Sequence, residues 1–404
     1  MLIKIAWKNI WRNRTRSAIL ITAISLGIWA LIFINGVSIG MVEGYIDSAI
    51  LERTSHLQIH LPEFVEEPEI TRHFDREPVI SYLDTSAFVK EYSSRIFANG
   101  MISSAQSSRG ITIYGVDPAK ENALTGLKNQ LDEGEYLPED GGNYILIGDN
   151  IADKLGVKTR SRVVANFQNA AGEVTAAAFR VAGIIGGQST MAGNDQAYVA
   201  ITTLRQLTSL EPDRVHEIAL LVNQPEILDQ NQTSLATTFQ ALTVRNYKEI
   251  APDVALMGSQ IQISLTVMTV IFMLALIFGI INTMLMAVLE RYKELGMLLA
   301  VGMKKKQVFA MVVWETIFIS MVGVPIGILF GKLTIAWTGH RGINLERWSD
   351  SLTEFGLTTV IYPDLYPRHY VIIATAVLLT AVLAALYPAR KATSLNPIEA
   401  LRKI

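Results

Sequence analysis

Four long stretches of this chain carry almost no charge, and each is long enough to cross a lipid bilayer. Three of them hold no Asp, Glu, Lys or Arg, and they lie between Arg16 and Glu43, between Asp253 and Glu290, and between His369 and Arg390. The fourth, between Lys306 and Lys332, holds only Glu315. A helix needs about 20 apolar residues to cross a hydrocarbon core roughly 30 Å thick. The pattern predicts membrane-spanning helices at 17–42, 257–289, 307–338 and 369–388.

The stretch between the first two helices, residues 43–256, has the mixed composition of a water-soluble domain. Residues 55–61 alternate polar and apolar side chains, as a half-buried strand does. Similar patterns predict strands at 111–114, 144–147, 162–167, 173–185, 196–201 and 216–222, and helices at 149–155, 203–210 and 226–242. Asp149 or Asn150 is expected to cap the helix that ends before Gly156. The predicted fold class is membrane α-helical, with four transmembrane helices and a large mixed α/β extracytoplasmic domain between helices 1 and 2.

The composition agrees with this division. Half of the 404 residues are hydrophobic, but the mean hydropathy of +0.30 is too low for a chain that lies wholly in the membrane. Cysteine is absent, so packing alone must hold the soluble domain together. The apolar run after the basic N-terminus is longer than the core of a cleavable signal peptide, and we interpret it as an anchor that stays.

Basic residues gather at alternate ends of the predicted spans, which sets the expected orientation. They are Lys4, Lys8, Arg12, Arg14 and Arg16 before helix 1; Arg291, Lys293, Lys304, Lys305 and Lys306 between helices 2 and 3; and Arg390, Lys391, Arg402 and Lys403 after helix 4. Loops rich in Lys and Arg stay in the cytoplasm. Residues 1–16, 290–306 and 389–404, with both termini, are therefore expected inside, and 43–256 and the loop 339–368 outside.

Residues 1–16 have the pattern of an amphipathic helix that lies at the membrane surface. Their apolar positions are expected to face the lipid boundary and their basic positions the headgroups or a partner; these are Ile5, Trp7, Ile10 and Trp11, and Lys8, Arg12 and Arg14. The alternative is a plain flanking segment that obeys the rule for basic residues.

The third membrane helix carries two unusual features. Gly323, Gly327 and Gly331 recur every four residues, a spacing that lets another helix approach closely, and Pro325 between them is expected to kink the helix. Glu315 is an acid inside a membrane span, where it is either an ion or proton site or a structural hydrogen-bonding partner. We favour the structural interpretation because the four uncharged stretches hold no second acid or histidine to make a relay.

The sequence holds no recognisable catalytic, metal-binding or nucleotide-binding motif. The nearest approach to a phosphate-binding loop, at Gly331 and Lys332, lacks the hydroxyl that follows the lysine and sits in a membrane span. We therefore expect no enzyme activity, no metal and no cofactor on this chain, and no nucleic-acid partner.

The predicted cytoplasmic loop 290–306 is the strongest functional signal. Charged residues flank an apolar stretch, which is typical of a short helix that docks into a partner's groove rather than of a solvated loop. Leu295, Leu298 and Leu299 are the side chains expected to enter that groove.

Several segments together resemble the MacB/FtsX-type ABC transporter permeases. The loop 290–303 is similar to the family's coupling region, 387–401 (YPARKATSLNPIEAL) to its C-terminal ending and 6–17 (AWKNIWRNRTRS) to its start. In the soluble domain, 114–118 (YGVDP) and 179–184 (FRVAGI) are similar to two further family elements. The resemblance spans the whole chain.

The resemblance implies that this chain is a permease subunit of the mechanotransmission type. A dimer of separate ATPase subunits would carry ATP and Mg, and a second permease subunit, identical or paralogous, would pair with this one in a bacterial inner membrane. The implied contacts with the ATPase are Glu290, Arg291, Glu294, Leu295, Gly296, Leu298, Ala300 and Gly302. Leu299 departs from the Arg that is usual there, and Arg160 and Ser161 replace the usual Gly-Asp pair.

Residues 55–60 (SHLQIH) and the lack of a fused ATPase look most like the lipoprotein-release (Lol-type) permeases. The implied substrate is a lipoprotein or another amphiphile, passed to a periplasmic carrier or adaptor protein. Two alternatives stay open: a MacB-like efflux component that works with an adaptor, and an FtsX-like signalling protein that transports nothing and regulates a cell-wall hydrolase.

The second membrane helix extends without charge from Val254 to Leu289, which is about 54 Å of helix. Because this exceeds the thickness of a bilayer, its outer part is expected to form a stalk. Four apolar residues there are candidates for a substrate path that also contacts membrane lipids, namely Met257, Ile261, Ile263 and Met268. The alternative is ordinary packing against helix 1 or a second subunit.

Overall fold

The computed structural model describes residues 2–12, 14–186, 195–348 and 359–394. The chain divides into two compact units. The helical unit consists of Met1–Val42, Ser259–Asn344 and Val360–Ile404, and the sheet unit of Glu43–Gly258 and Leu345–Thr359.

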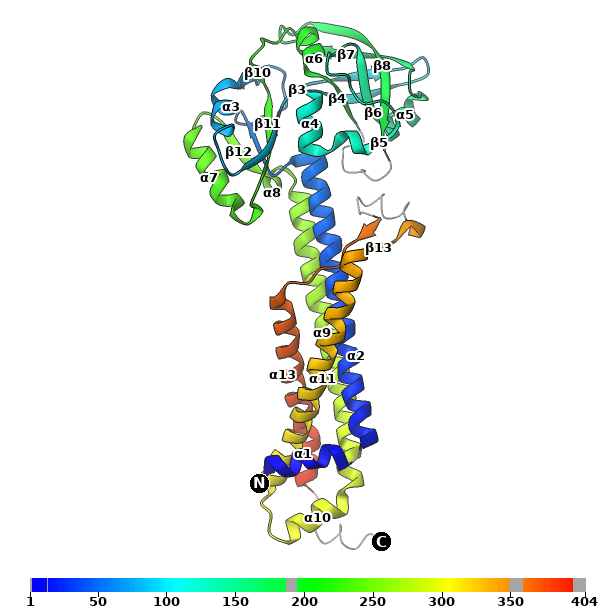
Figure 1. The fold of residues 1–404 in the computed structure, drawn as a ribbon, viewed down its shortest axis with the longest axis vertical. Helices are drawn as coiled ribbons and strands as arrows, with labels where there is room; N and C mark the ends of the chain where they lie inside the picture. The colour runs from blue at the N-terminus through cyan, green and yellow to red at the C-terminus, as the bar shows by residue number, and fades with distance from the viewer. Residues whose placement is uncertain (1, 13, 187–194, 349–358, 395–404) are drawn as a thin grey trace. The chain divides into compact units, whose positions relative to one another are not determined.

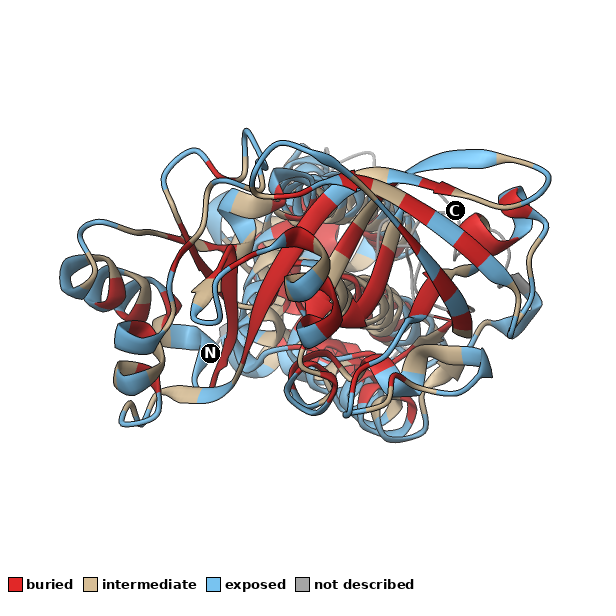
Figure 2. Ribbon diagram, turned by 90° about the horizontal axis from the view of Figure 1, so that it is seen from above, coloured by how far each residue is buried: buried red, intermediate tan, exposed pale blue. Residues whose placement is uncertain are grey.

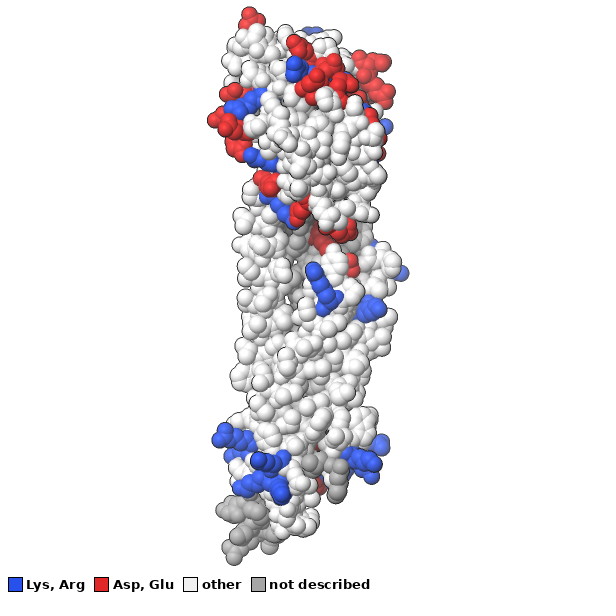
Figure 3. Space-filling model, turned by 90° about the vertical axis from the view of Figure 1, so that its left-hand side faces the viewer, with Lys and Arg blue, Asp and Glu red and all other residues white. Residues whose placement is uncertain are grey.

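The helical unit contains the four long apolar helices that the sequence predicts (Figure 1). They are α2 (Arg14–Ala49), α9 (Pro252–Glu290), α11 (Lys305–Arg341) and α13 (Pro367–Thr393), and each is long and apolar enough to cross a membrane. The first residues of α9 and the last of α2 belong to the sheet unit. On the face seen in Figure 3, the surface between the basic residues at the two ends of these helices is largely free of charge. The predicted fold class is confirmed.

The four helices share their apolar core unequally. Ile24, Ile28 and Ile32 of α2 are buried against α11, and small residues such as Ala381 let α13 pack closely. By contrast, only about 11% of the membrane-spanning window of α9 is buried within the chain. Most of α9 is therefore available to lipid or to another protein.

The sheet unit is built on one mixed sheet, and its strands are largely buried (Figure 2). In spatial order they are β12 (Thr243–Asn246), β1 (Leu57–His60), β11 (Glu217–Val222), β3 (Val89–Ser103), β4 (Ser108–Val116), β9 (Gln196–Ala200), β6 (Tyr144–Gly148), β8 (Val174–Ile185) and β5 (Leu131–Gly134), with β7 (Arg162–Gln168) paired to β3 and β8. The pairs β4–β9 and β6–β8 are parallel, and the other pairs are antiparallel. This topology confirms the mixed α/β prediction.

Short helices and ribbons complete the unit. The helices are α3 (Glu77–Leu83), α4 (Pro118–Thr125), α5 (Asp149–Leu155), α6 (Ile201–Thr208), α7 (Leu228–Thr238) and α8 (Tyr247–Ile250), with the short turns η1 (Ile50–Thr54), η2 (Leu127–Gln130) and η3 (Pro225–Ile227), and the strands β2 (Phe74–Asp75) and β10 (Arg214–Val215). Gly156 ends α5 in the left-handed conformation, as predicted. The prediction of a side-chain cap is wrong: Gly148 occupies the N-cap position, and Asp149 is the first helical residue.

The predicted outer loop, 339–368, contains a small ribbon in which β13 (Ile343–Asn344) pairs with β14 (Val360–Ile361), and the turn η4 (Glu346–Trp348). Residues 349–358 lie outside the described residues, as do residues 395–404 of the predicted tail. The predicted helix at 226–242 is shorter than expected, because η3 precedes α7 and α7 ends at Thr238.

Candidate functional site

The loop between α9 and α11 folds into a separate short helix, α10 (Tyr292–Ala300). A turn closes its end: the backbone amides of Gly302 and Met303 donate hydrogen bonds to the carbonyls of Leu299 and Leu298, at 3.1 and 3.0 Å. Gly302 has a φ of +102°, and a Cβ added there would meet no atom within 4 Å. Glycine is therefore needed at position 302 because of the backbone conformation, and not because another group packs closely against it.

The two faces of α10 differ from the prediction. Leu295 is buried, and Leu298 and Leu299 pack against the same helical core, so these three side chains do not form the outer face. Met297 and Val301 are 54% and 83% exposed. A helix places residues four apart on one face, so Met297 and Val301 form an exposed apolar surface. The prediction that Leu295 faces a partner's groove is wrong, because the leucines of α10 pack against the other helices of this chain.

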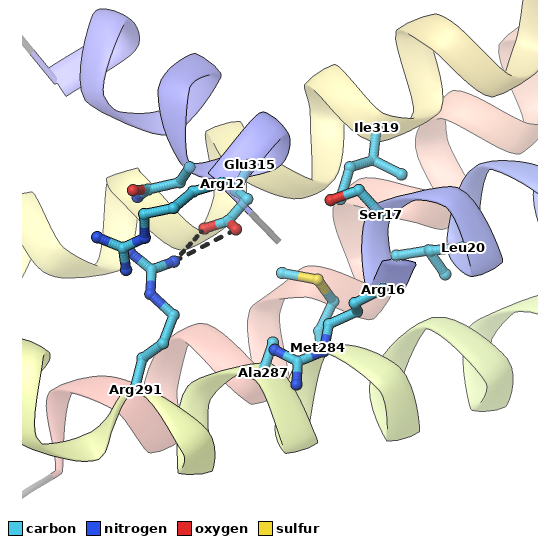
Figure 4. Close-up of a pocket in the computed structure, with 10 residues that line it drawn as sticks. Arg12, Arg16, Ser17, Leu20, Met284, Ala287, Arg291, Glu315 and Ile319 are labelled. Atoms are coloured by element: carbon cyan, nitrogen blue, oxygen red, sulfur yellow. Dashed lines mark hydrogen bonds and ion pairs between the residues drawn. The ribbon is translucent and has the colours of Figure 1, made fainter. Parts of the chain in front are cut away.

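Charged side chains link α10 to α1 and α11, and α2 to α9, and we name this group the charge cluster: Arg12, Arg16, Glu290, Arg291, Glu294 and Glu315. Arg291, at the N-cap of α10, pairs with Glu315 of α11 at 3.2 Å and with Glu294 at 3.1 Å. Arg12 of α1 (Leu2–Arg12) pairs with Glu294, and Arg16 of α2 pairs with Glu290 at the end of α9. Figure 4 shows Arg291 and Glu315 pointing toward one another from separate helices. The charge cluster therefore joins α1, α10 and α11 through one set of ion pairs, and α2 and α9 through another.

The burial of these charges differs along the charge cluster. The side chains of Arg291 and Glu315 are only 14% and 12% exposed, whereas those of Arg12 and Glu294 are about half exposed. Burial acts to raise the pKa of Glu294, but hydrogen bonds from Arg12 and Arg291 outweigh it and hold that pKa below its usual value. A cavity of about 10 Å³, large enough for one water, lies among Asn9, Arg16, Ser17 and Glu315.

Glu315 thus has a basic partner across the bundle, and its charge is balanced. It lies on α11 near the end of the bundle that carries α10, where an arginine of the neighbouring helix meets it. This placement is what a structural hydrogen-bonding partner requires. The sequence did not identify Arg291 as the partner of Glu315, because the part that Arg291 plays in setting the membrane orientation already explained it.

The amphipathic helix α1 is separate from α2 and packs against α11. Trp7 and Trp11 are 43% and 52% exposed, as expected for residues at a lipid boundary. Ile10 is buried in the helical core, however, and its carbonyl accepts a hydrogen bond from the Ser17 hydroxyl at 2.7 Å. The prediction that Ile10 faces lipid is therefore wrong: α1 uses that side for packing.

The glycine stripe of α11 lies against α2. A Cβ at Gly327 would lie 2.8 Å from the Ser25 carbonyl oxygen and from the Cβ of Ile28. At Gly323 and Gly331 it would lie 3.0 and 2.7 Å from side-chain atoms of Ile24 and Ile32. The Ser25 hydroxyl also donates to the Gly323 carbonyl at 2.9 Å. Small residues that allow such an approach are typical of tightly packed membrane helices.

The four candidate substrate-path residues do not share one environment. Met257 packs in a small cluster of the sheet unit with Tyr45 and Val254. Ile261 is partly buried, whereas Ile263 and Met268 are 64% and 41% exposed. Of the four, Ile263 and Met268 are thus exposed apolar side chains of α9. Met257 instead packs within the chain, as the alternative to a substrate path requires.

Two family models match the chain, one on each part. The MacB-like periplasmic core domain matches residues 17–238, and the FtsX-like permease C-terminal region matches residues 266–397. The two matches together include all four apolar helices and most of the sheet unit.

Full-length relatives agree with these matches. The lipoprotein-releasing system transmembrane protein LolC of Haemophilus influenzae is 25% identical over 390 residues, which is 94% of this chain and 91% of that protein. An uncharacterised ABC transporter permease of Methanocaldococcus jannaschii is 23% identical over 99% of this chain and 97% of its own. The solved periplasmic region of MacB from Actinobacillus actinomycetemcomitans covers 50% of this chain and 93% of that structure, with a TM-score of 0.36 and 16% identity.

The core-domain model covers more than half of the chain, the second model covers the membrane helices that follow, and the relatives extend from end to end. The chain belongs to the ABC transporter permeases that combine a MacB-like periplasmic core domain with an FtsX-like permease C-terminal region.

Proposed function

We propose that this permease couples ATP hydrolysis by a separate ATPase subunit to the release of a lipoprotein, or another amphiphile, from the inner membrane. The observation that carries the coupling is the form of α10. It offers Met297 and Val301 outward while its charged end is tied to neighbouring helices. A partner that docks on this surface would move the bundle and not only a loop.

The charge cluster supplies the route for that movement. Arg291 connects α10 to α11 through Glu315, and Glu294 connects it to α1 through Arg12. The glycine stripe holds α11 against α2, and α2 is one continuous helix from Arg14 to Ala49, whose last residues belong to the sheet unit. A push on α10 would therefore reach, through packed helices, the last residues of α2, which belong to the sheet unit.

The lipoprotein substrate rests on the likeness to LolC and on α9. Most of α9 is exposed within the chain, and Ile263 and Met268 present apolar side chains from it. Such a surface suits acyl chains that enter from the bilayer. In this proposal both termini are cytoplasmic, the sheet unit is periplasmic, a second permease subunit completes the pathway, and a carrier or adaptor receives the substrate.

Introducing a charge on the outer face of α10 is expected to uncouple the permease. Met297→Asp places a carboxylate in a surface that must become dry when the ATPase docks, so we expect at least a tenfold loss of permease-stimulated ATP hydrolysis. The measurement is ATPase activity of the reconstituted complex. Val174→Asp is the control, since Val174 is 77% exposed on β8, far along the chain from α10. Full stimulation by Met297→Asp in an assembled complex would contradict the proposed docking surface.

A photo-reactive amino acid at Ile263 is expected to capture the substrate. We expect cross-links to a lipid-modified protein in membranes without ATP, and their loss when ATP is added. Leu333 of α11, which is 58% exposed, is the control for nonspecific capture in the bilayer. Equal cross-linking at Ile263 and Leu333, unchanged by ATP, would contradict a substrate path along α9.

A further inference from the structure

One face of the sheet unit carries a buried arginine between two acids. Strand register places Arg95 of β3 directly beside Glu217 of β11, and Phe97 and Asn99 of β3 beside Tyr114 and Thr112 of β4. Paired residues of antiparallel strands point to the same side. These side chains therefore line one continuous surface of the sheet, on which Glu121 of α4 also lies.

The charges on this surface do not balance. Arg95 donates two hydrogen bonds to Glu121, from Nε at 3.1 Å and Nη2 at 2.6 Å, and one to Oε1 of Glu217, from Nη1 at 2.9 Å. Arg95 and Glu217 are each 8% exposed and Glu121 is 1% exposed. Burial acts to lower the pKa of Arg95, but the two carboxylates hold it above its ordinary value. One cation thus faces two anions, and Oε2 of Glu217 accepts no hydrogen bond from any described residue.

A cavity of about 110 Å³ adjoins this carboxylate. Besides Arg95 and Glu217, its lining includes Phe64, Phe97, Asn99, Thr112 and Tyr114. The rings of Phe64 and Phe97 meet edge to face, with centroids 4.9 Å apart. Aromatic rings attract a cation through the ring quadrupole. A carboxylate beside them attracts it by direct charge pairing.

We propose that this cavity binds an organic ammonium group, either a small amine or a lysine side chain. Arg95 gives Glu121 a bidentate bond and Glu217 a single one, so the surplus negative charge lies on Glu217, on the cavity wall. An anion would meet that carboxylate, and a neutral group would leave it without a counter-ion. This inference is independent of the transport function proposed above.

Saturation-transfer NMR on the full-length permease in nanodiscs tests the proposal, with n-butylammonium as the probe. We expect saturable transfer to n-butylammonium, and at least fivefold weaker transfer to the neutral isostere n-butanol and to butyrate. Glu217→Gln is expected to remove the difference between the amine and the alcohol. This variant leaves one arginine facing one glutamate, so the fold should persist, which thermal unfolding would check.

A second variant keeps the test decisive if Glu217→Gln is unstable. Thr112→Ile fills the cavity with a residue that suits a strand and leaves both carboxylates in place; we expect it to abolish the amine signal. Nα-acetyl-lysine methylamide distinguishes the source of the ligand. If it competes with n-butylammonium, a protein lysine is the ligand, and if only the free amine binds, a small amine is. Equal signals from n-butylammonium and n-butanol, or an amine signal that survives both variants, would overturn the proposal.

Discussion

Arg291→Ala is expected both to lower the stability of the helical unit and to abolish the coupling of ATP hydrolysis to the permease. The substitution leaves Glu315 buried without its partner, and removing one member of a buried ion pair typically costs about 3–5 kcal/mol. It also detaches the N-terminus of α10 from α11. We expect a clear fall in the thermal unfolding temperature of the purified permease, and loss of stimulated ATP hydrolysis in the part that stays folded.

Two matched variants separate stability from coupling. Lys293→Ala removes a neighbouring exposed charge of α10 and is expected to behave like the unmodified protein. The double variant Arg291→Gln, Glu315→Gln replaces the ion pair by neutral amides and is expected to recover most of the stability, because no buried charge is left alone. A normal unfolding temperature and normal coupling in Arg291→Ala would show that the charge cluster neither stabilises the bundle nor transmits movement.

Gly327→Leu is expected to separate α2 from α11. Even the first carbon of a side chain at this position lies 2.8 Å from the Ser25 carbonyl oxygen, which is backbone and cannot rotate away. Forcing extra atoms into a packed interior typically costs about 1–3 kcal/mol of stability. A leucine adds three more carbon atoms beyond the Cβ. We expect Gly327→Leu to be recovered mainly as aggregated or degraded protein, and Gly327→Ala as folded protein with a reduced unfolding temperature.

Gly279 of α9 provides the control, since a Cβ there meets no atom within 4 Å. Gly279→Ala makes the same chemical change in an apolar helix and is expected to leave the unfolding temperature unchanged or raised. Gly331→Ala should lie between the two, because its contacts are side-chain atoms of Ile32 that can shift. If Gly327→Ala unfolds at the same temperature as Gly279→Ala, the close contact between α2 and α11 does not exist in the membrane.

The membrane helices could be predicted from the sequence because one strong physical requirement defines them: about 20 uncharged residues in succession. Strands such as β7 and β8 could also be predicted, because a strand with one buried face requires polar and apolar residues to alternate. The central strand β3 was not, although it is the longest described strand. Its 15 residues include Ser93, Ser94, Asn99 and Gly100, which interrupt the apolar pattern, and its position is fixed by pairing with β11, β4 and β7.

The candidate site was predictable in location but not in geometry. The charges around an apolar stretch identified α10, whereas its inner and outer faces depend on which side meets α11. Likewise, Glu315 stood out as an acid in a membrane span, but its partner Arg291 lies 24 positions away, and Glu294 meets Arg12 from 282 positions away. Sequence spacing carries no information about such contacts between different helices.

The place of β1 in the sheet has a consequence for the biogenesis of the protein. Residues 57–60 lie between β11 and β12, whose residues are 217–222 and 243–246, so β1 has no strand partner until about 160 more residues have been made. At about 5–20 residues per second, that synthesis takes roughly 8–30 s. In the orientation proposed above, β1 with its apolar Leu57 and Ile59 stays unpaired outside the cytoplasm throughout this interval. Its productive folding therefore depends on what shields that strand, and holdase chaperones of that compartment should have their largest effect before residue 222 emerges.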